Sequence, residues 1–212
     1  MELNKFIEKR PFLFHLTDQK NLQLIIKQGR LFSTNSLIDK ANKEEYLPIK
    51  RRKRLAHFEL DINGEIYSIR DQQPISEKSL KKCLTHNWEC ADFYESLNSR
   101  VFMWPTLDRL WRHFNRYVSE NPIILRFETN SLLQINQNVK FCRLNSGATR
   151  ANSYLGGKPP ERGMETFQLA VNYTTSISSV AEVTFENECI LPETFCLSNS
   201  PDGIWEIVNL LD

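Results

Sequence analysis

The sequence predicts a single mixed α+β domain that spans residues 1–212. A chain of 212 residues with a 41% hydrophobic fraction is long enough for one well-buried core and rather short for two. Short strand-like runs lie before and between segments of helical periodicity, which favours a mixed fold. The absence of a βαβαβ rhythm and of a glycine-rich phosphate loop argues against a doubly wound dinucleotide fold.

The N-terminal segments predict a strand, a helix and a hairpin. Residues 11–17 (PFLFHLT) form an apolar run opened by proline, which is typical of a short buried strand. Asp18 is a suitable cap for the amphipathic helix that follows, and Gly29 is a suitable end for it. Alternating runs on both sides of Asn63 and Gly64 predict a β-hairpin.

The middle of the chain predicts helices with strands between them. Helical periodicity marks three segments: 76–84, 87–97 and 107–118. Residues 100–105 and 122–129 are short apolar runs bounded by proline and predict buried strands. The aromatic residues of the third helix lie at helical spacing, so we expect them in the core.

The last part of the chain predicts a long connection and two strands. Residues 145–162 are rich in Gly, Ser, Asn and Pro, and we expect this connection on the surface, in contact with a ligand or partner. Residues 165–173 and 178–188 alternate well and are separated by a short polar link, so we predict that they pair antiparallel.

The charge distribution contains one strongly basic run. The net charge is only +1, so no global field attracts a polyanion, but Lys50–Arg54 (KRRKR) are five consecutive positive charges. They lie in the polar region 34–56, for which we predict a surface loop with some helix. Such a run is usually a solvated face, and binding of phosphates is the functional alternative.

Cysteine usage and hydropathy favour a cytoplasmic protein that has no membrane partner. No apolar stretch approaches the roughly 20 residues that span a bilayer, and the N-terminus mixes charges too evenly for a secretory signal. The five cysteines are scattered, as expected for reduced thiols. His86 and Cys90 share a helical spacing, but no second pair completes a metal site, so we predict none.

Several polar residues are embedded in apolar sequence. Buried polar groups need partners, and a bound ligand is one way to supply them. These residues are His15, Asn21, Arg70, residues 98–100 and Glu165.

Each of these residues also has a purely structural explanation. His15 could be a core histidine bonded to a backbone carbonyl, and Asn21 could cap the helix that follows it. Arg70 could pair with the aspartate next to it. Glu165 could form a local ion pair with Arg162, three residues earlier. Spacing alone therefore predicts a pocket of unknown chemistry.

Two motifs resemble a known family. HLTDQKNLQLIIKQGRL (15–31) resembles the amino-terminal motif of the DarT-type nucleic-acid ADP-ribosyltransferase toxins, with His-x-Thr, Asn-Leu and a helix ending in Gly at the same spacing. RGMETFQLAVNY (162–173), followed by VAEVTFENE, resembles the catalytic strand of that family. The segments NSRVFMW, IRDQQP, NSGATR and RGMETF resemble a related branch of bacterial domains over about residues 11–190.

The resemblance implies an ADP-ribosyltransferase-like fold, a split pair of small β-sheets with helices before and between the strands and NAD in the cleft. It implies that His15 bonds the ribose beside nicotinamide, that Thr17 helps to hold the nicotinamide amide and that Asn21 lines the same wall. Arg100 of the NSR segment is a further predicted NAD-binding residue.

The resemblance also implies a catalytic carboxylate and arginine. Glu165 is the predicted carboxylate, which stabilises the cation-like sugar and takes the proton of the acceptor. Glu182, on the neighbouring predicted strand, is the alternative. An arginine is expected because a guanidinium pairs with phosphate in bidentate fashion. Arg70 is the first choice, and Arg52 in the basic run is the second, because the catalytic arginine of the DarT-type family falls in a comparably basic stretch.

The predicted function is that of an NAD-dependent mono-ADP-ribosyltransferase, a toxin or phage-defence effector. A nucleic-acid base in DNA or RNA is the favoured acceptor, because of the resemblance and the run Lys50–Arg54, and an antitoxin protein is a predicted partner. Protein side chains and water are the next candidate acceptors. Two further hypotheses are a catalytically silent module of the same fold that senses a nucleotide or binds a partner, and an RNA phosphate-removing transferase of a related fold.

Overall fold

The computed structural model describes residues 1–211 and has a mixed α+β fold, which confirms the predicted class at that level. The helices are α1 (Leu3–Lys9), α2 (Leu22–Gln28), α3 (Thr34–Ala41), α4 (Glu77–Leu80), α5 (Cys90–Asn98), α6 (Leu107–Tyr117) and α7 (Thr129–Ile135). The strands are β1 (Phe12–Asp18), β2 (Arg30–Phe32), β3 (Phe58–Ile62), β4 (Glu65–Ile69), β5 (Arg100–Met103), β6 (Pro122–Glu128), β7 (Lys140–Cys142), β8 (Gln168–Leu169), β9 (Glu182–Glu186), β10 (Glu188–Ile190), β11 (Thr194–Ser198) and β12 (Glu206–Asn209). Within residues 1–211 no helix has the length and apolarity needed to cross a membrane.

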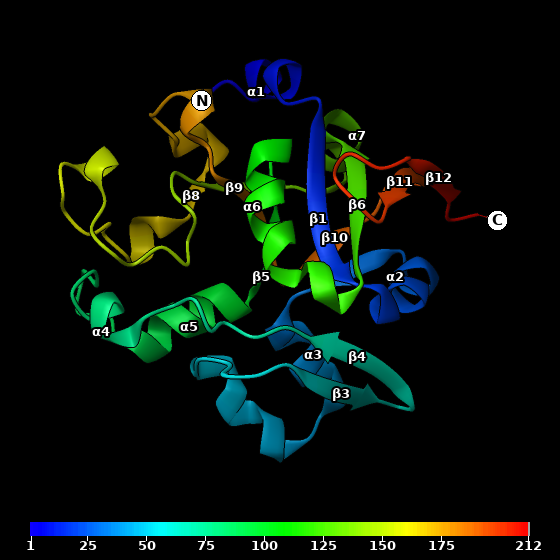
Figure 1. Ribbon diagram of the computed structural model, residues 1–212, viewed down its shortest axis with the longest axis horizontal. Helices are drawn as coiled ribbons and strands as arrows, with labels where there is room; N and C mark the ends of the chain where they lie inside the picture. The colour runs from blue at the N-terminus through cyan, green and yellow to red at the C-terminus, as the bar shows by residue number, and fades with distance from the viewer. Residues whose placement is uncertain (212) are drawn as a thin grey trace.

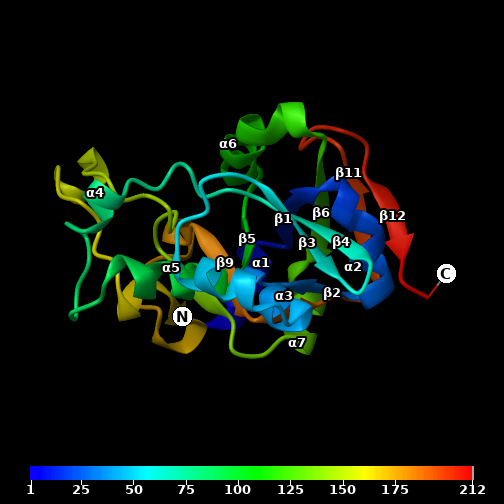
Figure 2. The ribbon, with the colours of Figure 1, turned by 90° about the horizontal axis from the view of Figure 1, so that it is seen from below.

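Two antiparallel four-stranded sheets form the body of the described chain (Figure 1). One sheet has the strand order β1-β6-β11-β12, and the other has the order β5-β9-β7-β8. Two smaller ribbons pair β2 with β10 and β3 with β4. The β3–β4 hairpin and α3 lie together at one end of the molecule (Figures 1 and 2).

An isolated antiparallel bridge joins the two large sheets at the start of β1. The backbones of Phe14 and Trp104 exchange two hydrogen bonds, with N···O distances of 3.0 and 2.8 Å. β1 pairs along its length with β6, whereas β5 pairs with β9, so the two sheets diverge from this bridge. His15, the residue after the bridge on β1, therefore lies where the sheets separate.

Both large sheets contribute to one hydrophobic core. Leu13 and Phe127 from the first sheet belong to the same buried cluster as Phe141 and Val183 from the second. Phe6 of α1 is 0% exposed, and its ring centroid lies 4.7 Å from that of Phe141. The cluster therefore ties the N-terminal helix and the two sheets to one another.

Helix α6 covers the opposite face of β1 (Figures 1 and 2). Alternation along β1 directs Phe14 and Leu16 to this face, where they pack with Leu110 and Phe114 of the helix. The aromatic residues of α6 therefore lie in the core, as predicted from their spacing. The helix also lies over the region where the two sheets diverge, so its polar residues lie close to His15.

Local signals in the N-terminal part led to correct predictions. The strand at residues 11–17 is β1, and Gly29 ends α2 in the left-handed region with φ of 59°. Asn63 and Gly64 turn the chain between β3 and β4 with φ of 54° and 88°. Two successive residues with positive φ are the geometry that tight hairpins favour, and glycine accepts it without strain.

The predicted hairpin between residues 165–173 and 178–188 is wrong. β8 is only two residues long, and β7 lies between β8 and β9. Glu165 does not open a strand but belongs to the 3₁₀ turn Met164–Thr166. Alternation along a segment indicates a strand with one buried face, but it does not identify the partner strand.

Candidate functional site

His15 is held at the divergence of the sheets by a hydrogen bond to β5. Its Nδ1–H donates to the carbonyl of Phe102 at 2.9 Å, so the protein fixes the tautomer that leaves Nε2 as an acceptor. Burial lowers the pKa of His15 to about 4, and the positive charge of Arg70 acts in the same direction. The imidazole is therefore neutral at physiological pH, and its Nε2 makes no hydrogen bond with the described residues.

Thr17 and Asn21 connect β1 to the β3–β4 hairpin. The Asn21 side-chain amide donates to the Thr17 hydroxyl at 3.2 Å and to the Ser68 carbonyl at 2.9 Å, and its oxygen accepts from the Ser68 amide at 2.8 Å. The polar atoms of Asn21 are thus bonded to protein groups. Asn21 fixes the hairpin in position beside Thr17.

Arg70 follows β4 and brings a guanidinium to the same place. It donates from Nη2 to the carbonyl of Thr17 at 3.0 Å and stacks on the Tyr117 ring at 4.3 Å. Its Nε and Nη1 are buried and have no hydrogen-bond partner. Burial lowers the pKa of Arg70, because two of its N–H groups lack the bonds that water would supply. An anionic or carbonyl oxygen of a ligand would satisfy them.

The basic run is largely bonded to the protein. Lys50 pairs with Asp39, Arg51 with Asp92 and Glu95, and Lys53 donates to the carbonyl of Gln73. The run ends a 3₁₀ segment, Glu44–Arg51, in the region predicted as loop with some helix.

Two arginines of this run have different environments. Arg52 is exposed, and its side chain has no hydrogen-bond or ion-pair partner within residues 1–211, while its amide donates to the Ile49 carbonyl. Arg54 is partly buried and donates from Nε to the carbonyl of Arg70 at 2.7 Å and from Nη1 to Asn98. Burial lowers the pKa of Arg54 to about 10. The run therefore reaches the candidate site through Arg54, which the sequence did not indicate.

A small cavity of about 110 Å³ lies between α6 and the end of β5, near His15 and Arg70. The rings of Trp104 and His113 stack in its wall with centroids 4.3 Å apart. Burial and the positive charge of Arg70 lower the pKa of His113 to about 3, and His15 is close enough to contribute. The remaining lining residues are Arg109, Arg112, Asn145 and Ala181.

Glu182 lies at the start of β9, next to a residue that lines this cavity. It is 3% exposed, and its Oε2 accepts a hydrogen bond from the Ser146 amide at 3.0 Å. Burial raises the pKa of Glu182 to about 7, while Ser146 and the charges of Arg162 and Arg109 oppose that rise. A carboxyl with this pKa changes its ionisation near neutral pH.

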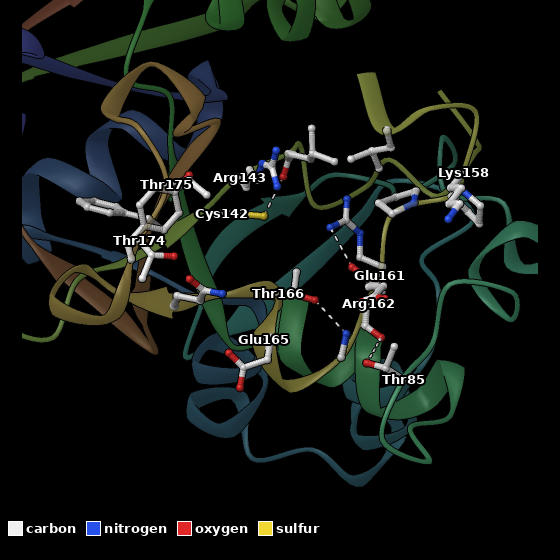
Figure 3. Close-up of a pocket in the computed structure, with 18 of the residues that line it drawn as sticks. Thr85, Cys142, Arg143, Lys158, Glu161, Arg162, Glu165, Thr166, Thr174 and Thr175 are labelled. Carbon is white, nitrogen blue, oxygen red and sulfur yellow. Dashed lines mark hydrogen bonds between the residues drawn. The ribbon is translucent and has the colours of Figure 1, made fainter. Parts of the chain in front are cut away.

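Glu165 belongs to a different place. It lines a separate cavity of about 410 Å³ together with Arg143, Lys158 and Glu161 (Figure 3). Its side chain points away from Arg162, whose guanidinium bonds backbone carbonyls, so the ion pair between them does not form (Figure 3). No described contact joins Glu165 to His15.

Arg100 is the first residue of β5. Its guanidinium stacks on Phe167 at 4.3 Å and pairs with Glu186 at 3.1 Å, while Nε and Nη1 are buried without partners. Of the predicted site residues, the structure brings together His15, Thr17, Asn21 and Arg70, and it does not join Arg52, Arg100 or Glu165 to them by any described contact. No group of three or more His, Cys, Asp and Glu side chains within residues 1–211 could hold a metal ion.

The polar residues of α6 were not among the predicted site residues. Arg109, Arg112 and Arg116 recur at intervals of three and four, which places them on one face of a helix, and His113 lies on the same face. This signal was present beside the aromatic spacing. The spacing in the sequence therefore indicated a basic face on this helix, separate from its buried aromatic face.

Comparison with known proteins identifies one family. A family described as "Family of unknown function (DUF7002)" matches residues 11–193. No curated protein matches the chain, and no solved structure does. Because the match covers most of the sequence, including β1, α6 and β9, the chain belongs to the DUF7002 family.

Proposed function

We propose that the protein is an NAD-dependent mono-ADP-ribosyltransferase that uses His15 and Glu182. The observation that carries the proposal is that both groups adjoin one small cavity without lining it. His15 follows Phe14, whose backbone bridges the lining residue Trp104, and Glu182 follows the lining residue Ala181. A neutral imidazole and a buried carboxyl at one cavity suit the transfer of a ribosyl group.

The residues fit a dinucleotide. The free Nε2 of His15 can accept a hydrogen bond from a ribose hydroxyl, and the unpaired N–H groups of Arg70 can donate to a phosphate or carboxamide oxygen. At about 110 Å³ the cavity is smaller than the roughly 300 Å³ of pockets that enclose whole ligands. It would therefore enclose a single ring, beside the stacked pair of Trp104 and His113, and leave the rest of the dinucleotide outside.

The two groups have protonation states that suit this reaction. Bound NAD supplies an ADP-ribosyl group, whose bond to nicotinamide breaks while positive charge develops on the ribose. A neutral His15 adds no positive charge beside that ribose, because its pKa is about 4. Glu182 in its ionised form would stabilise the developing charge and then accept the proton of the acceptor. We therefore favour Glu182 over Glu165 for this role.

A nucleic acid is the acceptor that the surface favours. Arg109 and Arg112 line the cavity from one face of α6, and Arg116 follows on the same face, where it pairs with Asp71. Arg112 is exposed and has no ion-pair partner within residues 1–211. Unpaired guanidinium groups at the mouth of a site suit the phosphates of a polynucleotide strand.

The test is to incubate the protein with NAD labelled in the adenylate and with separate pools of DNA, RNA and protein. We expect label in nucleic acid and release of nicotinamide. Glu182→Gln should lower the rate by about 10²–10³-fold, because it removes the charge that stabilises the transition state. Glu165→Gln, in the other cavity, should change the rate by only a few-fold.

The reverse order of the two variants would return the catalytic role to Glu165. Label in protein alone would reject the nucleic-acid acceptor, and release of nicotinamide without label in any pool would identify water as the acceptor. If NAD raises the melting temperature of the protein but no nicotinamide is released, the protein is a nucleotide-binding module instead. The burial of Glu182 against Ser146 is the feature that favours this second function.

A further inference from the structure

Arg162 is a buried cation bonded to carbonyl groups instead of a carboxylate. Its side chain and backbone are 3% exposed. Nη2 donates to the carbonyls of Asn145 and Ala148, both at 2.8 Å, and Nε donates to that of Ala148 at 3.2 Å. A guanidinium that binds two carbonyls three residues apart fixes the turn between them.

The turn held by Arg162 is residues 145–148, part of the NSGATR segment. The Ala148 amide donates to the Asn145 carbonyl at 2.9 Å, and the Gly147 amide donates to the Asn145 side chain at 3.0 Å. Ser146, between these residues, donates its amide to Glu182 at 3.0 Å. The turn thus presents a backbone N–H to the carboxyl.

Arg162 is itself fixed from the other side. Its amide donates to the Cys83 carbonyl at 2.7 Å, and its carbonyl accepts from the Thr85 amide at 2.9 Å. The Thr85 hydroxyl donates to the same carbonyl at 3.3 Å (Figure 3). Arg162 therefore connects the segment near residue 84, through its backbone, to the 145–148 turn, through its side chain, and the turn in turn bonds Glu182.

We infer that Arg162 is a positioning residue for Glu182, which holds the 145–148 turn so that the Ser146 amide stays bonded to the carboxylate. The inference rests on the proposed function for its catalytic meaning, but the geometry it describes exists without catalysis. Arg162 does not itself line the small cavity, and its one contact with a lining residue is the bond to the Asn145 carbonyl, so its effect on Glu182 must pass through the turn and through its charge.

The physical consequence is control of ionisation. Burial alone favours the neutral form of Glu182, and the Ser146 amide and hydroxyl together with the charge of Arg162 favour the ionised form. The balance places the pKa of Glu182 at about 7. Without Arg162 the turn would relax and the charge would disappear, so the carboxyl would stay protonated at neutral pH and could not act as a base.

The direct test is a ¹³C NMR titration of Glu182 in the full chain, with its side-chain resonance assigned by its loss in Glu182→Gln. Arg162→Gln should raise the pKa of Glu182 from about 7 to about 8 or higher, since an opposite charge and a hydrogen bond are lost. Arg162→Lys retains the charge and should give a smaller rise. Ser146→Ala retains the backbone amide and the Arg162 bonds to the turn and should also give a smaller rise than Arg162→Gln, and Arg162→Lys tests the turn if Arg162→Gln does not fold.

The matched control is Arg143→Gln, which removes a positive charge from an exposed residue of the larger cavity that does not bond the turn. It should leave the titration of Glu182 unchanged. An unchanged titration in Arg162→Gln, or in Arg162→Lys if Arg162→Gln does not fold, would overturn the inference, as would an equal rise in Arg143→Gln.

Activity separates this inference from the proposed function. If wild-type protein releases nicotinamide, the acid limb of its pH–rate profile should shift to higher pH in Arg162→Gln, by the same amount as the NMR titration of Glu182. An acid limb at the same pH in both proteins would reject the positioning role. If wild-type protein releases none while the titration shifts as expected, the proposed function fails and the structural role of Arg162 stands.

Discussion

Burial moves the pKa values of His15 and Glu182 in opposite directions, because it disfavours the charged form of each. The imidazole becomes a weaker base and the carboxyl a weaker acid. Both groups are then close to neutral in charge at pH 6, where free histidine would be largely protonated and free glutamate ionised. The pH dependence of stability can therefore be assigned to particular residues.

His15 should make the protein less stable in mild acid. Its pKa is about 4 in the folded state and 6.5 in the reference state, so between these values the unfolded chain binds more protons. The contribution is complete above pH 6.5 and is lost as pH falls toward 4, by on the order of 1–3 kcal/mol. Glu182 acts in the opposite sense, since its raised pKa makes stability fall as pH rises from 4.5 to about 7.

The measurement is urea unfolding between pH 4 and 8 for the wild type and for His15→Asn. The asparagine amide can replace the Nδ1–H that donates to Phe102 but does not titrate, so the free energy of unfolding should lose part of its acid dependence. An identical pH dependence in both proteins would show that His15 titrates normally.

Arg70 should matter more for binding than for folding. Arg70→Met removes a bond to Thr17 and the charge stacked on Tyr117, but it also removes two buried N–H groups that have no partner. These terms oppose each other, so we expect a change in unfolding free energy of about 1 kcal/mol or less. Under the proposed function, calorimetric affinity for NAD should fall at least about tenfold. A large loss of stability with unchanged affinity would mean that Arg70 is a structural residue.

At the scale of elements, the β3–β4 hairpin is attached to β1 through a side chain. Asn21 satisfies both the amide and the carbonyl of Ser68 on β4 and also binds Thr17 on β1. The Ser68 hydroxyl adds a bond to Asp18 at 2.9 Å. The amide and carbonyl of Ser68 lie on the edge of β4 that does not pair with β3. Asn21, just before α2, bonds both of these groups.

Asn21→Ala should loosen the hairpin. It leaves the two backbone groups of Ser68 without their partners, which we expect to cost about 1–3 kcal/mol. Hydrogen exchange should quicken for amides of β3 and β4 more than for amides of β6 and β11. Gly64→Ala, which strains the tip of the same hairpin at φ of 88°, is a useful comparison because it should not disturb β1. Equal acceleration in all strands would argue against a local attachment.

At the scale of the molecule, the two sheets share one core although few backbone bonds join them. The Phe14–Trp104 bridge is the described backbone link between β1 and the end of β5, whereas the main buried cluster takes side chains from both sheets and from α1. Packing instead of sheet pairing therefore holds the halves together. The single domain stays a prediction, which the unfolding behaviour can test.

Phe6→Ala should destabilise both sheets together. The ring is fully buried against Phe141, so its removal leaves a cavity and should cost about 3–5 kcal/mol. Calorimetry should show one transition that moves to lower temperature without broadening into two. A second transition, or loss of protection in one sheet only, would show that the halves fold independently.

The sequence by itself determined the parts of this protein that depend on local backbone preference. β1, the glycine that ends α2, the Asn63–Gly64 hairpin and the aromatic face of α6 follow from residues near one another in the chain. β11 and β12 and helix α7 were not predicted, since their segments carry short patterns that tertiary packing stabilises.

Only the tertiary structure decided which strands are neighbours and which polar residues share a site. β7 lies between β8 and β9, Glu182 directly follows a residue that lines the small cavity whereas Glu165 lines the larger one, and Arg54 instead of Arg52 bonds Arg70. Alternation and charge runs are properties of one segment, whereas pairing and desolvation depend on segments distant in the chain. The physical reason is that a strand with alternating apolar residues can pair with any strand that has a matching apolar face. Packing in the shared core then determines which strand becomes its neighbour.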